Sequence, residues 1–359
     1  MRLRRVVARG FRNLAPLDLT VPSEGVALLG PNGAGKTNVL EAIYYPVLFR
    51  SFRGATDAEV AGFGGTGFHA EVAFGEEGRS GTAAATWTSA GRSKRLVVDG
   101  EPAKTLASAA GRWLAVAFLP TDTGLASGAP SERRHYLDRM LALAETSYFR
   151  TLARYRQGIA RRNAALRNGD HAAAQAFEPV IAAAGAPVVA SRLAWLKGAR
   201  ERFTKEFADL GEPLPADLAY HGDVALADPA AWPERFQGAR ERDRQRGITS
   251  VGPHRDDLKL SLAGKALGRY GSTGQQRSAA IALKLLELGT LKEARGEEPA
   301  LILDDVFAEL DRDRQARLAA RLTGGGVRQA LVSSPRREEL PSELKLEVWE
   351  VAGGVVRGA

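Results

Sequence analysis

The chain has 359 residues and no cysteine, which excludes disulfide bonds and thiolate chemistry. It contains no run of about eighteen or more apolar residues, and its basic N-terminus lacks the apolar core of a signal peptide, so we expect a cytoplasmic protein without a membrane span. The formal net charge of +8 favours a polyanionic partner such as nucleic acid, although a general enrichment in arginine would give the same excess.

Residues 1–122 alternate short apolar runs with turns and predict an α/β region. Strands are predicted at 6–8, 17–21, 26–29, 69–74, 82–88, 95–100 and 114–119. After the third of these runs, residues 30–37 match the phosphate-binding pattern G-x-x-x-x-G-K-[ST], and residues 38–44 predict a helix. This strand–loop–helix order is the context in which the amides of a helix N-terminus bind phosphate.

The phosphate-binding loop (the P-loop) assigns a role to each kind of residue in it. Glycines let backbone amides approach phosphate oxygens, Lys36 places a positive charge between the β- and γ-phosphates, and the Thr37 hydroxyl ligates Mg²⁺. Alone, this motif predicts a nucleoside triphosphatase. The predicted nucleotide ligands in the loop are Gly30, Pro31, Asn32, Gly33, Ala34, Gly35, Lys36 and Thr37.

From residue 123 to 247 the pattern is mainly helical, and we predict a second lobe inserted between the two parts of an ATPase lobe, 1–122 and 248–359. The absence of sustained heptads argues against a long coiled coil. The insert begins with an arginine-rich stretch that predicts a stripe of DNA-phosphate contacts on one helix face, with a merely solvated face as the alternative. The predicted contacts are Arg150, Arg154, Arg161 and Arg162.

The C-terminal part of the chain contains two further nucleotide-handling segments. Residues 301–305 predict an apolar strand that ends in two acids, of which Asp304 is placed to hold Mg²⁺ and Asp305 to orient or deprotonate the attacking water. Upstream, residues 272–276 are close to the S-x-G-Q segment with which ABC-type ATPases contact a nucleotide held by a second subunit. Ser272 and Gly274 would contact its γ-phosphate, with Gln275 near the start of a helix; an ordinary helix cap is the alternative interpretation.

Two positions after the acidic strand complete this pattern. Asp311 falls where ABC-type ATPases carry the D-loop that crosses the dimer interface. Ser333 or Ser334 ends a strand predicted at 329–333, where those proteins place a γ-phosphate sensor. In this order, the segments predict an ATPase that binds ATP and Mg²⁺, uses Lys36 and the acid pair in catalysis, and closes as a homodimer.

Residues 11–14, 41–44, 128–138, 252–258 and 274–311 form an ordered set of segments that resembles the RecF family, bacterial DNA repair ATPases related to the heads of SMC-type proteins. The resemblance covers nearly the whole chain. It implies an α/β fold with an ABC-ATPase-like head, a mixed sheet with helices, and an inserted helical lobe that caps DNA. It also places Arg12 and Asn13 beside the nucleotide.

The resemblance further implies weak, DNA-stimulated ATP hydrolysis and binding to duplex DNA near single-strand gaps. It implies cooperation with RecR and RecO in loading RecA, and hence roles in replication restart and the SOS response. Pro120-Thr121-Asp122 departs from the family's usual Pro-Glu-Asp. Two alternatives remain: a transport-type ABC ATPase subunit coupled to a membrane partner, and a structural protein that binds nucleotide without hydrolysing it.

Overall fold

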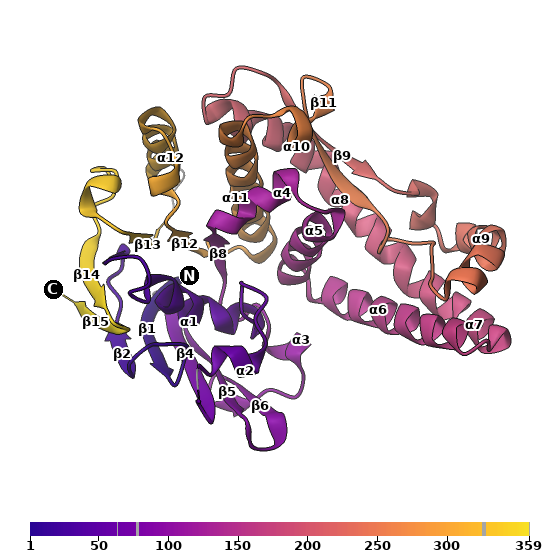
Figure 1. Ribbon diagram of the computed structural model, residues 1–359, viewed down its shortest axis with the longest axis horizontal. Helices are drawn as coiled ribbons and strands as arrows, with labels where there is room; N and C mark the ends of the chain where they lie inside the picture. The colour runs from indigo at the N-terminus through magenta and orange to yellow at the C-terminus, as the bar shows by residue number, and fades with distance from the viewer. Residues whose placement is uncertain (63, 77–78, 325–327, 359) are drawn as a thin grey trace. The chain divides into compact units, whose positions relative to one another are not determined.

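The computed structural model describes residues 1–62, 64–76, 79–324 and 328–358 (Figure 1). By their internal contacts these residues form two compact units. Unit 1 comprises Met1–Asp122, Asp209–Gly211 and the residues from Glu287 on, and unit 2 comprises Thr123–Ala208 and Glu212–Leu286. Unit 2 begins where the predicted insert begins. It also takes in residues 248–286, which the sequence assigned to the ATPase lobe.

A mainly parallel sheet forms the centre of unit 1. Its strand order is β15-β14-β3-β13-β12-β8, and only the β14–β15 pair is antiparallel. Burial on both faces explains why β3, β8, β12 and β13 are short and largely apolar runs. The bounds of the strands in this sheet are Gly25–Leu29 (β3), Ala115–Phe118 (β8), Ala300–Asp304 (β12), Ala330–Ser334 (β13), Glu347–Ala352 (β14) and Val355–Gly358 (β15). Because β3, β12 and β13 run parallel, their carboxyl ends meet at one edge of the sheet.

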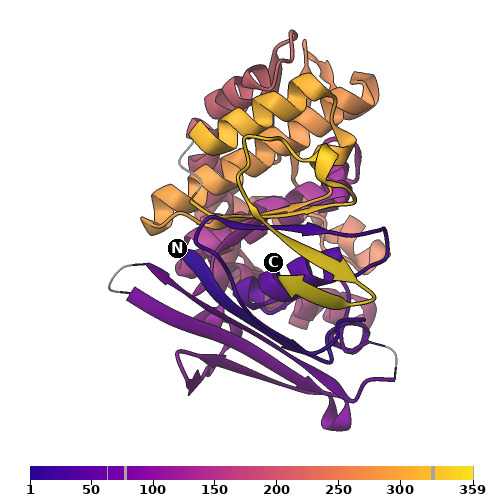
Figure 2. The ribbon, with the colours of Figure 1, turned by 90° about the vertical axis from the view of Figure 1, so that its left-hand side faces the viewer.

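A second sheet of unit 1 is antiparallel, with the order β2-β1-β4-β5-β6-β7. Figure 2 shows its long strands, in indigo to purple, across the lower part of the view. The alternation of buried and partly exposed residues along β4 is typical of a sheet with one covered face. The strands are Arg2–Arg9 (β1), Leu17–Thr20 (β2), Gly67–Glu76 (β4), Arg79–Thr88 (β5), Ser93–Val98 (β6) and Glu101–Pro102 (β7).

Helix α1 (Lys36–Leu48) contacts strands of both sheets in unit 1. It is therefore buried nearly all round, and Tyr45 packs edge-on against Phe11 and Phe68, with ring centroids 5.9 and 5.1 Å away. This packing holds the P-loop, which precedes α1, against the parallel sheet. The other α-helices that lie wholly within unit 1 are α2 (Asp57–Val60), α3 (Leu106–Ala109) and α12 (Arg312–Gly324).

Unit 2 is mainly helical and includes a small antiparallel sheet. In this sheet β10 pairs with β9, with Leu260 opposite Leu218, and this pairing joins the segment after residue 247 to the insert. The elements are α4 (Gly124–Ser127), α5 (Pro130–Ala144), α6 (Thr146–Arg167), α7 (His171–Ala176), α8 (Glu178–Asp209), β9 (Ala216–His221), α9 (Trp232–Arg246), β10 (Asp257–Leu262), β11 (Lys265–Ala266), α10 (Leu267–Tyr270) and the start of α11 (Thr273–Arg295).

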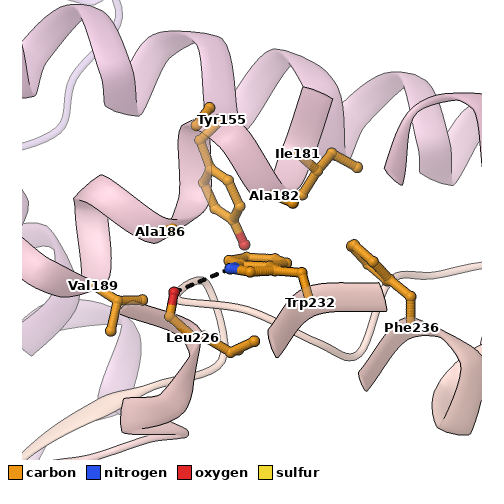
Figure 3. Close-up of a cluster of buried hydrophobic side chains, with 9 residues drawn as sticks. Tyr155, Ile181, Ala182, Ala186, Val189, Leu226, Trp232 and Phe236 are labelled. Carbon is orange, nitrogen blue, oxygen red and sulfur yellow. Dashed lines mark hydrogen bonds between the residues drawn. The ribbon is translucent and has the colours of Figure 1, made fainter. Parts of the chain in front are cut away.

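An aromatic cluster forms a core of unit 2 where α6, α8 and α9 meet. Figure 3 shows the indole of Trp232 between the rings of Tyr155 and Phe236, whose centroids lie 6.3 and 5.5 Å from it. The indole N–H donates to the Leu226 carbonyl oxygen at 3.0 Å, so the buried polar group is satisfied. Gly185 of α8 permits this approach, because a Cβ there would lie 2.4 Å from the Trp232 ring.

One described segment, His171–Asp209, is long and apolar enough to cross a membrane by length and composition. It consists largely of α8, whose residues Ile181, Val188 and Val189 are fully buried in unit 2. The core helix of a globular protein passes the same test, so the segment is weak evidence for a membrane span.

Candidate nucleotide-binding site

The P-loop connects β3 to α1, and its glycines Gly30, Gly33 and Gly35 have positive φ angles. Gly35 has a φ of 113°, and a Cβ at this position would lie 3.3 Å from Asn13 Oδ1 and 3.4 Å from the Gly354 Cα. Glycine therefore suits both the backbone conformation and the space. Gly35 is also the N-cap of α1 and offers no side-chain cap, so the first amides of the helix are left for a ligand.

Lys36 is held beneath the loop. Its Nζ donates to the carbonyl oxygens of Gly30 at 2.7 Å and Pro31 at 3.3 Å, and the residue is only 4% exposed. It borders a cavity of about 280 Å³, a volume that suits the phosphate chain of a nucleotide better than a whole nucleotide. The lining residues are Asn32, Gly33, Gly35, Lys36, Thr37, Asn38, Arg53 and Asp305.

The acid pair at the end of β12 lies beside the P-loop, because β12 and β3 both pair with β13. The Thr37 hydroxyl donates to Asp304 Oδ1 at 2.9 Å. Ser333, near the end of β13, also donates to Asp304 Oδ1 at 2.7 Å, and its Oγ lies 3.1 Å from Asp305 Oδ1. The parallel sheet thus brings together three segments that are far apart in the sequence.

Asp305 adopts an uncommon backbone conformation, with a φ of 50°. Its N–H donates to Ser333 Oγ at 2.9 Å, which secures this conformation, and its side chain reaches the cavity. Burial raises the pKa of the neighbouring Asp304, and the charge of Asp305 adds to the rise, whereas hydrogen bonds from Ser333 and Thr37 oppose it. Ser333 therefore positions both acids.

The donor atoms beside the cavity fit Mg²⁺. This ion prefers oxygen ligands and is commonly held by one or two carboxylates together with substrate phosphates. Thr37 Oγ1 and Asp304 Oδ1 are two such oxygens, 2.9 Å apart. Within the described residues, no group of three or more His, Cys, Asp or Glu side chains forms a metal site by itself. A cation here would therefore need oxygens from a phosphate as well.

Asn13 and Arg12, which the family resemblance placed beside the nucleotide, have different surroundings. Asn13 Oδ1 accepts a hydrogen bond from Asn38 Nδ2 at 2.6 Å, next to the P-loop. Arg12 instead forms a two-bond pair with the buried Glu41 of α1, at 2.9 and 3.0 Å, and donates to the Glu59 carbonyl oxygen at 3.1 Å. It is not among the described residues that line the cavity.

The sequence analysis did not identify Arg53 and Asn38, which also line the cavity. Asn38 directly follows the motif, so its position beside the P-loop could have been predicted from the sequence. Arg53 follows a left-handed turn at Phe49, φ 55°, that redirects the chain after α1. Its Nη1 lies 3.9 Å from Glu41 Oε2, and its side chain is 39% exposed. No motif in the sequence marks this second cation.

The S-x-G-Q segment belongs to unit 2 and begins α11. Ser272 Oγ accepts a hydrogen bond from the Gln275 N–H at 3.2 Å, and Gln275 Oε1 accepts from the Ser272 N–H at 2.9 Å. This reciprocal pair is a capping box, the feature expected from the helix-cap interpretation. Ser272 is nevertheless exposed and Gly274 partly exposed. Asp311 is also exposed and accepts a hydrogen bond from the Arg314 N–H, at the start of α12.

The predicted arginine stripe needs a correction at Arg162. Arg150, Arg154 and Arg161 are exposed residues of α6 that share one face. Arg162 is 1% exposed and pairs with Asp243 at 2.8 Å and Glu178 at 3.1 Å. Adjacent residues of a helix lie about 100° apart around its axis, so Arg161 and Arg162 do not share a face. Arg162 is part of the interior of unit 2.

No protein-family model matches the chain. Over 99% of its length it is 35% identical to the DNA replication and repair protein RecF of Anaeromyxobacter sp., of which 99% is covered. Over 89% of its length it is 36% identical to RecF of Chloroflexus aurantiacus, of which 90% is covered, and over 93% it is 33% identical to RecF of Myxococcus xanthus, of which 91% is covered.

Solved structures give the same result. A structure of the recombination mediator protein RecF with ATP, in the RecFOR pathway, superimposes with a TM-score of 0.90 at 26% identity, covering 100% of this chain and 97% of that one. An SMC head bound to a domain of ScpA superimposes with a TM-score of 0.58 at 14% identity, covering 100% and 97%, which shows likeness of fold alone. The chain belongs to the RecF family of DNA replication and repair proteins.

Proposed function

We propose that this chain binds and hydrolyses ATP and couples that cycle to DNA in recombinational repair. The observation that carries the proposal is that Lys36, Thr37 and Asp305 line one cavity at the carboxyl edge of the parallel sheet, where Thr37 is hydrogen-bonded to Asp304. The RecF relative whose structure contains ATP supports the choice of nucleotide. The proposed location is the cytoplasm, because the relatives that match over nearly the whole chain are DNA replication and repair proteins.

The proposed chemistry follows from the positions of the side chains. Lys36 leaves its carbonyl partners for the β- and γ-phosphates, and the P-loop amides bind the remaining phosphate oxygens. Thr37 and Asp304 would hold Mg²⁺, which neutralises phosphate charge when bound. Asp305, fixed by Ser333, orients the attacking water and accepts its proton. Its side chain is one methylene shorter than the glutamate common in ABC-type ATPases, which is consistent with slow turnover.

We further propose that ATP closes a homodimer through the S-x-G-Q segment. The segment is exposed at the start of a helix of 23 residues, whose positive end favours a phosphate. In the closed dimer, Ser272, Gly274 and Gln275 of one protomer contact the γ-phosphate bound by the other protomer, and Asp311 lies at the interface. The capping box uses the N–H groups of Gln275 and Ser272, so this role would fall to the Ser272 hydroxyl proton and to the N–H groups of Thr273 and Gly274, which the box does not use.

The proposed DNA partner is duplex near a single-strand gap, with RecR and RecO acting in the same pathway to load RecA. The net charge of +8 and the exposed arginines of α6 support binding to a polyanion. The alternative of a transport-type ATPase subunit has no comparable support, since the full-length relatives are DNA repair proteins.

The proposal is tested by measuring DNA affinity for duplex, single-stranded and gapped duplex DNA, each with ATP, ADP and no nucleotide. We expect ATP to increase affinity for DNA that contains duplex, and the charge reversals Arg154→Glu and Arg161→Glu to weaken binding and flatten its salt dependence. DNA affinity that is the same in all nucleotide states would contradict the proposed coupling.

A further inference from the structure

Unit 2 contains a second cavity, of about 100 Å³, between α5, α6, α8 and the segment after residue 249. Arg192, Asp138 and Tyr155 at its base are buried, with Arg192 only 2% exposed, whereas His135 and Arg156 at its mouth are exposed. The volume is several times the roughly 30 Å³ of a water molecule and well below the roughly 300 Å³ at which pockets for organic ligands begin. It suits a small polyatomic ion.

The charged side chains around this cavity are mainly cationic. Arg134 of α5, Arg156 of α6 and Arg192 of α8 all line it, and Asp138 is the one acid among the described lining residues. Asp138 Oδ1 accepts from Arg192 Nη2 at 2.7 Å, and its Oδ2 accepts from Arg156 Nη2 at 2.9 Å. One carboxylate therefore faces three guanidinium groups within the lining.

Arg134 shows that the positive charge is incompletely balanced. Its Nη1 donates to the Asp256 carbonyl oxygen at 2.7 Å, and a guanidinium has five N–H donors in all. Burial lowers the pKa of Arg134, and the positive charge of Arg192 lowers it further, against the opposing effect of nearby carboxylates. The Asp256 carboxylate, 3.8 Å from Arg192, offsets part of this charge; burial raises the pKa of that acid, whereas its hydrogen bond with Tyr220 and the charges of Arg192 and Arg134 lower it.

The segment 252–257 makes the wall of the cavity rigid. It is part of the family resemblance, which assigns no function to it. The Pro253 carbonyl oxygen accepts from Arg192 Nη1 at 2.7 Å. His254 is fixed on both sides, since its Nδ1 lies 2.5 Å from the Tyr155 hydroxyl and its Nε2 lies 2.9 Å from the Thr249 carbonyl oxygen. Asp257 forms a two-bond pair with Arg133. The cationic groups are thus held in place before any ligand arrives.

We propose that this cavity binds one phosphate group, contacted by Arg134 and Arg156 above the buried Arg192. Planar guanidinium groups donate pairs of hydrogen bonds to phosphate oxygens, and an anion would offset the excess of guanidinium over carboxylate charge. A backbone phosphate of DNA and free phosphate share this chemistry. The first source rests on the proposed DNA-binding function, whereas the site itself does not depend on it.

Histidine NMR gives a local test with the full-length chain. Inorganic phosphate is added at pH 8 and constant ionic strength while the ring signals of His135 and His254, which line the cavity, are compared with that of His69 in unit 1. We expect saturable shifts at the two cavity histidines and none at His69. Arg134→Gln should weaken phosphate binding at least roughly tenfold. Arg156→Gln should also weaken it, and this substitution should change the fold little because Arg156 is exposed.

The matched control is Arg200→Gln, because Arg200 is an exposed residue of the same unit that pairs with Asp217 outside the cavity. It should bind phosphate as the parent does. The conclusion is an adventitious ion only, if the ring signals of the cavity histidines do not shift, or if the control variant loses as much affinity for phosphate as the two cavity variants. Either result overturns the proposal.

A short DNA duplex then distinguishes the two sources. If duplex binding shifts the same signals and prevents phosphate from binding, the site holds a DNA phosphate. If duplex binds while phosphate still shifts these signals, the site holds free phosphate. A chain that binds phosphate here but binds no duplex in any nucleotide state retains the site and contradicts the proposed DNA function, so the two failures are distinguishable.

Discussion

Two cations of unit 1 face the position proposed for the phosphate chain, Lys36 and Arg53. Lys36 already has two carbonyl partners, whereas the nearest acid to Arg53 is Glu41 at 3.9 Å. Arg53 also opposes the rise in the pKa of Asp304 through its charge. It is therefore near enough to act on the acid pair and exposed enough to reach a ligand.

Replacing Arg53 with alanine should weaken ATP binding by about 1–2 kcal/mol, or roughly five- to thirtyfold, because a charged hydrogen bond to phosphate is lost from a partly solvated site. Titration calorimetry measures this. Arg50→Ala is the matched control, since Arg50 is exposed in the same segment and does not line the cavity. Equal losses in the two variants would show that only the general charge of the segment matters.

His254 makes the stability of the chain depend on pH. Burial lowers its pKa to about 4. The unfolded chain has the ordinary value of about 6.5, so the stabilising contribution is complete above that pH and is lost as pH falls toward 4. We expect urea unfolding to show a loss of up to roughly 3 kcal/mol between pH 7 and pH 4 from this group. His254→Gln should reduce that loss, and the control His69→Gln should leave it unchanged.

At the scale of elements, helix α6 contains two adjacent arginines, one exposed to solvent and the other buried. Arg161 is exposed, and Arg162, the next residue, lies between Asp243 and Glu178 in the interior. Removing one partner of a buried ion pair leaves an uncompensated charge. Arg162→Met should therefore lower the free energy of unfolding by about 3–5 kcal/mol, and Arg161→Met by less than about 0.5 kcal/mol. Thermal or urea unfolding of the two variants decides between a buried Arg162 and a stripe of four exposed arginines on α6.

Sequence patterns predicted those elements whose signals lie close together in the chain. The P-loop, the apolar strand that ends in Asp304, and most N-terminal strands were predictable because their signals lie within a few residues. Non-local pairing was not predictable: β10 pairs with β9, which moves residues 248–286 into unit 2, and β14 and β15 extend the sheet beyond the predicted final strand. Arg53 and the ion pairs of Arg162 also depend on segments that meet only in the folded chain.

At the scale of the whole molecule, the nucleotide cavity belongs to unit 1 and the S-x-G-Q segment to unit 2. In the proposed cycle each ATP is bound by the P-loop of one protomer and the S-x-G-Q segment of the other. In this arrangement, ATP binding by the monomer and closure of the dimer depend on different residues. A change in the S-x-G-Q segment should therefore abolish closure and leave ATP binding by the monomer intact.

The most direct measurement of this account is the mass of the Ser272→Arg variant in solution with saturating ATP, by sedimentation, beside the parent chain. Arginine places a bulky cation where the γ-phosphate of the partner would be contacted. The account predicts ATP binding equal to that of the parent, a dimer for the parent and a monomer for the variant, with hydrolysis lost together with the dimer. A variant that still dimerises with ATP at the concentrations at which the parent does would contradict the composite site and leave a nucleotide-binding protein without the proposed closure.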